Sequence, residues 1–318
     1  MENVTDAAAS MFGGEQAKPL IEAKNQLSSL VESLSEPQKQ LADLSSTAGG
    51  VPMESAGAAK EHFNTLTATF KDMVEGDPKK LLPPGAACAA SMWAKSIKKN
   101  LQALSKEADD LMGVVGSTPD KAKDELLTIK GSLDAASGGM GQVASVMQDA
   151  ATTLKGCLTS MDKLKELGST LEGVEVNFAD VLAKARGSLE AVNNSVANTP
   201  GTVVTMVEGL IDEVDTFKMR TPKKVVAAFK APFPCCCLNG GKGGEAQEKL
   251  ESGLDTVGAA VDFGPLLEGI KGIKTKMEGF DLNPAKAALD AVESGFSSAL
   301  APAKEAAAKI AAATGGGD

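Results

Sequence analysis

The stretch that decides the fold is residues 126–171, LLTIKGSLDAASGGMGQVASVMQDAATTLKGCLTSMDKLKELGSTL. Its apolar side chains recur at alternating steps of three and four residues, and Gly168 is the one member of the series without an apolar side chain. A period of 3.5 residues sustained this long is typical of helices packed along a seam, as in a coiled coil or a long bundle. The series is Leu126, Ile129, Leu133, Ala136, Met140, Val143, Met147, Ala150, Leu154, Cys157, Met161, Leu164, Gly168 and Leu171.

The same spacing recurs on both sides of this stretch and predicts further helices. Apolar stripes run through 27–44, 63–73, 97–115, 178–196, 203–217, 250–261, 266–277 and 289–310. We expect breaks near residues 138 and 170, because each of the glycines there weakens a helix by about 1 kcal/mol relative to Ala. Proline 37 is expected to kink or divide the first stripe. Helix starts are predicted at Thr118-Pro119, Thr221-Pro222 and Asn283-Pro284, where a capping side chain precedes a proline.

The composition supports an all-α fold. Of 318 residues 43% are hydrophobic but only 3% are aromatic, with no Tyr. A β-sandwich or a doubly wound sheet would need more β-branched and aromatic residues on its pleated faces. We therefore expect an elongated helical bundle of coiled-coil-like hairpins with heptad seams.

The chain lacks the sequence features of an enzyme. It contains one His, and it carries no phosphate-binding loop, nucleophile elbow, zinc motif or EF-hand loop. The many acidic residues fall on outward helix positions, where they are usually solvated. We therefore expect no catalysis, no metal, no cofactor and no small-molecule substrate.

Positive charge is concentrated in two islands without acidic residues, although the net charge of the chain is −10. Island 1 is residues 78–106 and island 2 is residues 217–244, and each carries six bases. The rest of the chain must then carry −22, which would oppose the binding of a nucleic acid. Only one Trp, Trp93, would be available to stack on the nucleobases of such a nucleic acid.

The two islands resemble each other in sequence. Each shows, in order, Thr-Phe-Lys, Pro-Lys-Lys, two aliphatic residues, two prolines and cysteine, which predicts an internally duplicated unit of helix, basic hinge and helix. We divide the chain accordingly into an N-terminal helical unit, 1–119, with the basic hinge 78–106; a long central heptad segment, 120–198; and a C-terminal helical unit, 199–318, with the basic, Cys-rich hinge 217–244.

The islands are interpreted as contacts to an anionic membrane. Each Lys or Arg near an anionic leaflet contributes about 1 kcal/mol, and apolar residues beside the bases suit burial among headgroups. The alternative is that both islands are exposed hinges whose lysines are merely solvated. The residues expected to bind the membrane are Lys79, Lys80, Trp93, Lys98, Lys99, Lys218, Arg220, Lys223, Lys224, Phe229, Lys230 and Phe233.

The adjacent cysteines Cys235, Cys236 and Cys237 favour membrane attachment over solvated hinges. Three adjacent thiols lack the spacing of a zinc site, and a disulfide between neighbours would be strained. Clustered thiols beside a basic amphipathic stretch are typical of S-palmitoylation, so we predict lipidation of the cluster and also of Cys88. Cys157 lies on the heptad seam and is assigned to core packing.

Targeting features agree with a protein on the cytoplasmic face of a membrane. The N-terminal residues lack a basic segment followed by an apolar run, so we expect no signal peptide. No apolar stretch of 18 residues is present, and five cysteines, an odd number, suit a reducing compartment. Thr221, which precedes a proline, is predicted to be a phosphorylation site whose phosphate would weaken the attraction of island 2 to anionic lipid.

The main functional hypothesis is therefore a scaffold attached peripherally to a membrane through its basic hinges and acylated cysteines. Its predicted partners are an anionic membrane surface and either a helical protein or another copy of the chain. Two alternatives stay open at this point. One is a helical pore-forming or membrane-remodelling protein, and the other is a soluble cytoskeletal protein that forms coiled-coil filaments.

Overall fold

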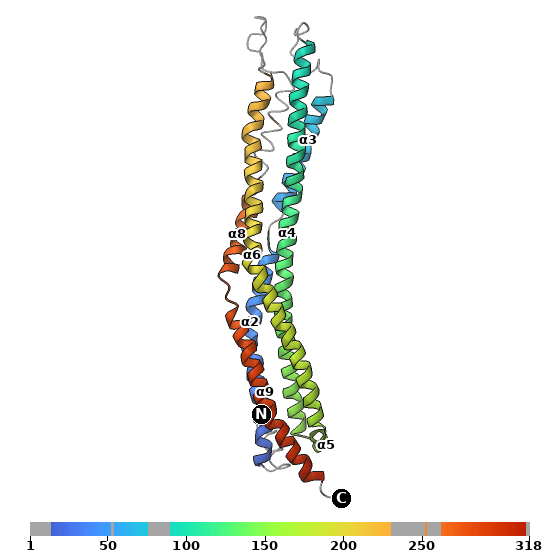
Figure 1. Cartoon of the computed structure of the whole chain (residues 1–318), viewed down its shortest axis with the longest axis vertical. Coiled ribbons are helices and arrows are strands. Elements are labelled where there is room, and N and C mark those ends of the chain that lie inside the picture. Colours follow the sequence, from blue (N-terminus) through green and yellow to red (C-terminus); the bar gives the residue numbers. More distant parts are fainter. Residues whose placement is uncertain (1–13, 52–53, 76–89, 230–251, 253–261, 316–318) are drawn as a thin grey trace. The chain divides into compact units, whose positions relative to one another are not determined.

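The structure is a computed structural model that describes residues 14–51, 54–75, 90–229, 252 and 262–315. Within these residues it contains seven helices and no strand (Figure 1). The all-α prediction is thus confirmed. The helices are α2 (Gly14–Gly49), α3 (Glu54–Glu75), α4 (Ala90–Cys157), α5 (Met161–Lys165), α6 (Leu167–Phe229), α8 (Gly264–Glu278) and α9 (Asn283–Gly315).

The heptad seam is the core of the long helices. From Leu126 to Cys157 every member of the series is at most 3% exposed, and Leu164 and Leu171 are buried as well. Gly168, the member without an apolar side chain, is exposed. The central stretch is not one helix. It comprises the end of α4, the short α5 and the beginning of α6.

The predicted break near residue 138 is wrong, because α4 continues through it without interruption. Two of the three glycines there, Gly139 and Gly141, lie close to neighbouring helices. A Cβ atom added at Gly139 would lie 3.0 Å from the Cα of Ala185 on α6, and one at Gly141 would lie 2.9 Å from the side-chain nitrogen of Gln38 on α2. The break predicted near 170 is found earlier, where Ser160 adopts an extended conformation before α5.

Two of the three predicted proline starts are also wrong. α4 continues through Thr118-Pro119 and α6 through Thr221-Pro222, whereas α9 does begin at Asn283. Likewise Pro37 does not divide α2. Pro37 and Pro119 are buried, so packing of their rings against neighbouring helices offsets the hydrogen bond that each proline removes.

By spatial contact the chain forms two units. Unit 1 is Met1–Gly49, Leu127–Asn198 and Lys276–Asp318, and unit 2 is Gly50–Leu126 and Thr199–Thr275. Both long helices, α4 and α6, contribute one part to each unit. The three parts delimited from the sequence are consecutive stretches, so this grouping does not test them.

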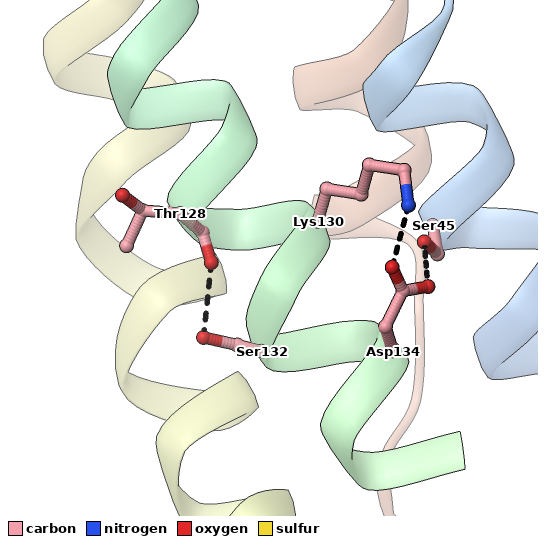
Figure 2. A network of polar contacts seen from close by, with 5 residues as sticks. All are labelled: Ser45, Thr128, Lys130, Ser132 and Asp134. Atoms are coloured by element: carbon pink, nitrogen blue, oxygen red, sulfur yellow. Dashed lines mark hydrogen bonds and ion pairs between the residues drawn. The ribbon is translucent and has the colours of Figure 1, made fainter. Parts of the chain in front are cut away.

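In unit 1, α2 and α4 run antiparallel and are linked by polar contacts. Ser137 Oγ donates a hydrogen bond to the carbonyl oxygen of Gln38 at 3.3 Å. Further along, Asp134 accepts hydrogen bonds from the buried Ser45 hydroxyl and from Lys130 Nζ, the latter at 2.5 Å (Figure 2). These bonds stabilise the ionised carboxylate and hold the pKa of Asp134 below its ordinary value, Lys130 having the larger effect. The network fixes the register of α2 on α4.

The first part of α6 also runs antiparallel to α9. Lys304 Nζ lies 2.6 Å from a Glu175 oxygen, and Arg186 lies 2.5 Å from Asp290 and 2.8 Å from Glu293. The two carboxylates raise the pKa of Arg186 further above its ordinary value, Glu293 having the larger effect. These partly exposed ion pairs align the helices.

Aromatic and small residues complete the ring of four helices in unit 1. The rings of Phe178 on α6 and Phe296 on α9 are stacked with centroids 3.7 Å apart. α9 also packs along α2, where a Cβ atom added at Gly295 would lie 2.8 Å from a methyl carbon of Leu30. With the contacts between α4 and α6 at Gly139, each helix thus has two neighbours, as in an antiparallel four-helix bundle.

Unit 2 consists of two stretches of equal length, each of which contains one basic island. Its described helices are α3, the first part of α4, the second part of α6 and most of α8. Phe63 of α3 contacts Phe217 of α6 with ring centroids 6.0 Å apart, and Lys271 of α8 pairs with Glu208 of α6 at 2.9 Å. The predicted duplication stays a prediction.

Candidate functional site

The candidate site is the end of unit 2 where α4 begins and α6 ends. Within unit 2 the two helices run antiparallel (Figure 1), and residues 107–114 of α4 and 212–217 of α6 line one groove. Island 1 enters α4 at Ala90 and island 2 leaves α6 after Phe229. The described parts of both islands, 90–106 and 217–229, therefore lie at this same end of the helix pair (Figure 1).

The described parts of the two islands are helical rather than hinges: residues 90–106 belong to α4 and residues 217–229 to α6. On α4 the side chains of Lys98 and Lys99 are exposed, and on α6 that of Arg220 is exposed. Lys218 is half-buried, with its Nζ atom 3.7 Å from an Asp215 oxygen. Side chains are thus described for four of the bases predicted to bind the membrane, and three of these four face solvent at this end.

Met219 adds an apolar side chain to this basic surface. It is 66% exposed, between Lys218 and Arg220 in the sequence. Sequence analysis did not single it out, because a Met in a helical stripe is usually assigned to the core. Its position is nevertheless recognisable, since Val214 and Phe217 define the buried stripe and Met219 falls outside it.

The remaining predicted site residues are only partly described or not described. For Trp93, Thr221, Lys223, Lys224 and Phe229 the structure gives the helical backbone but not the side-chain surroundings. The positions outside the described residues are Lys79, Lys80, Cys88, Lys230, Phe233, Cys235, Cys236 and Cys237.

Next to the basic end, α4 and α6 enclose an acidic groove with an apolar floor, of about 470 Å³. The groove reaches Glu107 on α4 and Phe217 on α6, and the bases begin immediately beyond, at Lys106 and Lys218. The sign of the charge therefore changes at the same level on both helices. The residues that line the groove are Glu107, Asp110, Leu111, Val114, Asp212, Glu213, Thr216 and Phe217.

Other chemistry in the described part of the chain is limited. The Cys157 thiol is buried, which raises its pKa and makes it a poor nucleophile, in keeping with its predicted core role. Among the described residues no group of three or more His, Cys, Asp or Glu side chains is arranged to hold a metal ion. No helix in the same residues combines the length and apolar character needed to span a bilayer.

Comparisons with models of protein families, with curated protein sequences and with solved structures give no match for this chain.

Proposed function

We propose that the protein is a non-enzymatic helical scaffold that attaches peripherally to an anionic membrane surface. The attachment uses the two basic islands and acyl chains on Cys235, Cys236 and Cys237. The observation that supports this best is that α4 begins and α6 ends at the same end of unit 2, which brings bases of both islands to one end of a helix pair.

The exposed side chains at this end have suitable chemistry for an anionic surface. Lys98, Lys99 and Arg220 face solvent, and each base near an anionic leaflet contributes about 1 kcal/mol. Met219 adds an exposed apolar side chain among them, of the kind that enters the headgroup region while the bases contact phosphates. Charge and apolar surface thus occur together, which a merely solvated stretch of lysines does not require.

The neighbouring groove determines how the helix pair would approach the membrane. Asp110, Asp212 and Glu213 are exposed on its rim, and their carboxylates would be repelled by anionic lipid. An approach along the side of the helix pair would bring them to the surface together with the bases. Attachment through the end keeps them away from it, so we infer an end-on orientation.

Stable attachment requires acylation in addition to the bases. An electrostatic contact of a few bases is reversible and is weakened by salt, which screens charges within about 8 Å at physiological ionic strength. A single acyl chain also binds reversibly, whereas two or three chains together with a basic patch anchor a protein stably. The bases would hold the protein at the surface, and the acylated cysteines would retain it there.

The electrostatic part is tested with unacylated protein and vesicles of neutral lipid with or without about one third anionic lipid. Wild type should float with the anionic vesicles at low salt and dissociate as salt is raised. The double variant Lys98→Glu, Lys99→Glu should bind at least about tenfold more weakly, because it replaces two attractive charges by two repulsive ones. The matched control is Lys121→Glu, Lys123→Glu, two exposed positions further along α4, which should bind like wild type.

Equal losses in both double variants would mean that net charge rather than this end governs binding. An absence of binding to anionic vesicles at low salt would overturn the electrostatic part of the proposal.

Acylation is tested separately by intact-mass spectrometry of protein from its native source. A triple Ser variant at Cys235, Cys236 and Cys237 should lose the palmitoyl increments and leave the membrane pellet at physiological salt. A triple variant that stays in the pellet through a high-salt wash would exclude the cysteines as the anchor.

A further inference from the structure

We propose that the face of unit 2 formed by α4 and α6 is a self-complementary interface for a second copy of this chain. In the resulting antiparallel dimer, Met219 of each copy occupies the acidic groove of the other. The proposal rests on described residues of unit 2 and does not depend on membrane attachment.

The groove provides the receiving half of the interface. Its floor contains Leu111, Val114 and Phe217, and its rim carries carboxylates from both helices. Of the residues that line it none is basic. An occupant that fits must therefore present an apolar side chain flanked by positive charges.

The same face of the helix pair presents such a group just beyond the groove. Positions three, four and seven residues apart share one face of a helix. Met219 follows Thr216 of the groove by three residues, and Arg220 follows Glu213 by seven, so α6 continues the groove wall with an exposed methionine and an exposed arginine. On α4 the exposed Lys106 precedes Asp110 by four residues and continues the other wall.

The charge pattern of this face is complementary to itself. Toward the end of the helix pair the face is basic, further inward it is acidic, and the change of sign falls at the same level on α4 and α6. A two-fold axis at that level, perpendicular to the helices, would superimpose the basic half of one copy on the acidic half of the other. In such an isologous interface every contact is made twice.

The level of Met219 fits this arrangement. On α6 the groove spans residues 212–217, and the bases begin at Lys218. Rotation about an axis between Phe217 and Lys218 would bring Met219 of one copy opposite Thr216, at the outer end of the groove of the other. An apolar side chain that is 66% exposed would become buried at the end of the groove floor formed by Phe217. Because the dimer would cover bases that also face the membrane, it is measured without lipid.

The first test is analytical ultracentrifugation of the full, unacylated chain in a reducing buffer at low salt. Wild type should show a monomer–dimer equilibrium that shifts toward monomer as salt is raised. Met219→Asp should weaken dimerisation at least about a hundredfold, because it removes a buried apolar contact twice per dimer and brings a carboxylate into an acidic groove. The matched control is Val176→Asp, since Val176 is 67% exposed on the same helix but belongs to unit 1.

A chain that stays monomeric at low salt and high concentration would overturn the proposal. A dimer that Met219→Asp and Val176→Asp affect equally would also overturn it, because association would then use another surface. Circular dichroism of both variants ensures that a loss of dimer is not a loss of fold.

The second test exchanges the charges of the two halves. Asp212→Lys with Glu213→Lys makes the α6 wall of the groove basic, and Lys106→Glu with Arg220→Glu brings two carboxylates into the basic half. Each double variant alone should be monomeric, because like charges would face each other at both contacts. A mixture of the two should form a heterodimer, since opposite charges then face each other at both contacts. Failure of the mixture to associate would refute the antiparallel arrangement.

Discussion

The two adjacent glycines Gly138 and Gly139, in the second half of α4, should respond oppositely to the same substitution. A Cβ atom added at Gly138 meets no atom within 4 Å, whereas one added at Gly139 would lie 3.0 Å from the Cα of Ala185 and 3.2 Å from its Cβ. Gly138→Ala should therefore change only the intrinsic helix propensity. Gly139→Ala changes the propensity equally, but in addition it pushes α4 away from α6.

The expected magnitudes follow from these two environments. Ala is more favourable than Gly in a helix interior by about 0.5–1 kcal/mol, so Gly138→Ala should stabilise unit 1 by about that amount. At Gly139 the same gain is opposed by overpacking against backbone, which typically costs about 1–3 kcal/mol because the close atom is not at the end of a flexible side chain. The unfolding free energies of the two variants should therefore differ by about 1–3 kcal/mol.

The assay should report on unit 1. Cys157 is buried there, so its reaction with a thiol reagent during urea titration measures the opening of that unit. The other four cysteines are replaced by Ser in all proteins compared. If both alanine variants are stabilised equally, α4 and α6 do not approach as closely at Gly139 as described. Adding Ala185→Gly to Gly139→Ala should recover part of the loss, which would identify the contact itself as the cause.

Four further predictions concern single substitutions. Leu154→Asp should destabilise the protein by several kcal/mol, because Leu154 is fully buried and the new charge would have no partner; an unchanged thermal unfolding curve would contradict the packing of the seam. Phe296→Ala should cost about 3–5 kcal/mol in urea titrations and Phe296→Leu clearly less, since Leu keeps most of the burial but loses the stacking on Phe178. Asp134→Asn should lower the unfolding free energy at neutral pH, and the difference from wild type should vanish in acid. The lowered pKa of Asp134 means that its stabilisation is present above the ordinary value of about 4 and is lost as the pH falls through the folded value. Thr221→Glu should weaken binding to anionic vesicles at low salt, because it introduces negative charge beside Lys223 and Lys224; binding as tight as that of wild type would exclude electrostatic switching at this position.

The fold class was predictable because one signal repeats along nearly the whole chain. The series from Leu126 to Leu171 requires a buried seam, and its described apolar members are buried. Local signals at glycines and prolines were less informative. Gly139 is a weak helix former, but its lack of a side chain allows α6 to approach, and this gain appears only when the partner helix is known. Pro119 interrupts a helix in isolation, whereas its burial in the bundle compensates for the lost hydrogen bond.

The real interruption between the long helices had a detectable signal. Ser160 precedes Met161 and Asp162, and a Ser followed by an acidic first turn is a common helix start. The break was instead predicted at Gly168 and Gly173, because their low helix propensity was the only signal considered.

For the candidate site, the sequence indicated its charges but not its geometry. The two islands were evident as stretches without acidic residues, and the convergence of their described parts at one end required only that α4 and α6 run antiparallel. The acidic groove could not be predicted in the same way. It depends on which residues of α4 face which residues of α6, and a shift of one helical turn would separate Asp110 from Asp212. Periodicity defines the face of each helix but not the level at which two helices pair.

The sharing of α4 and α6 between the two units has a consequence for how the chain can be divided. Unit 1 draws on three separate stretches and unit 2 on two, so no single cut in the backbone releases either unit whole. An N-terminal fragment that ended before α6 would lack one or more helices of each unit. A C-terminal fragment that began after α4 would also lack one or more helices of each unit. A protease that nicks either long helix should therefore release neither unit whole, and the excision of unit 2 would require two deletions, Gly50–Leu126 and Thr199–Thr275, with both pairs of ends rejoined.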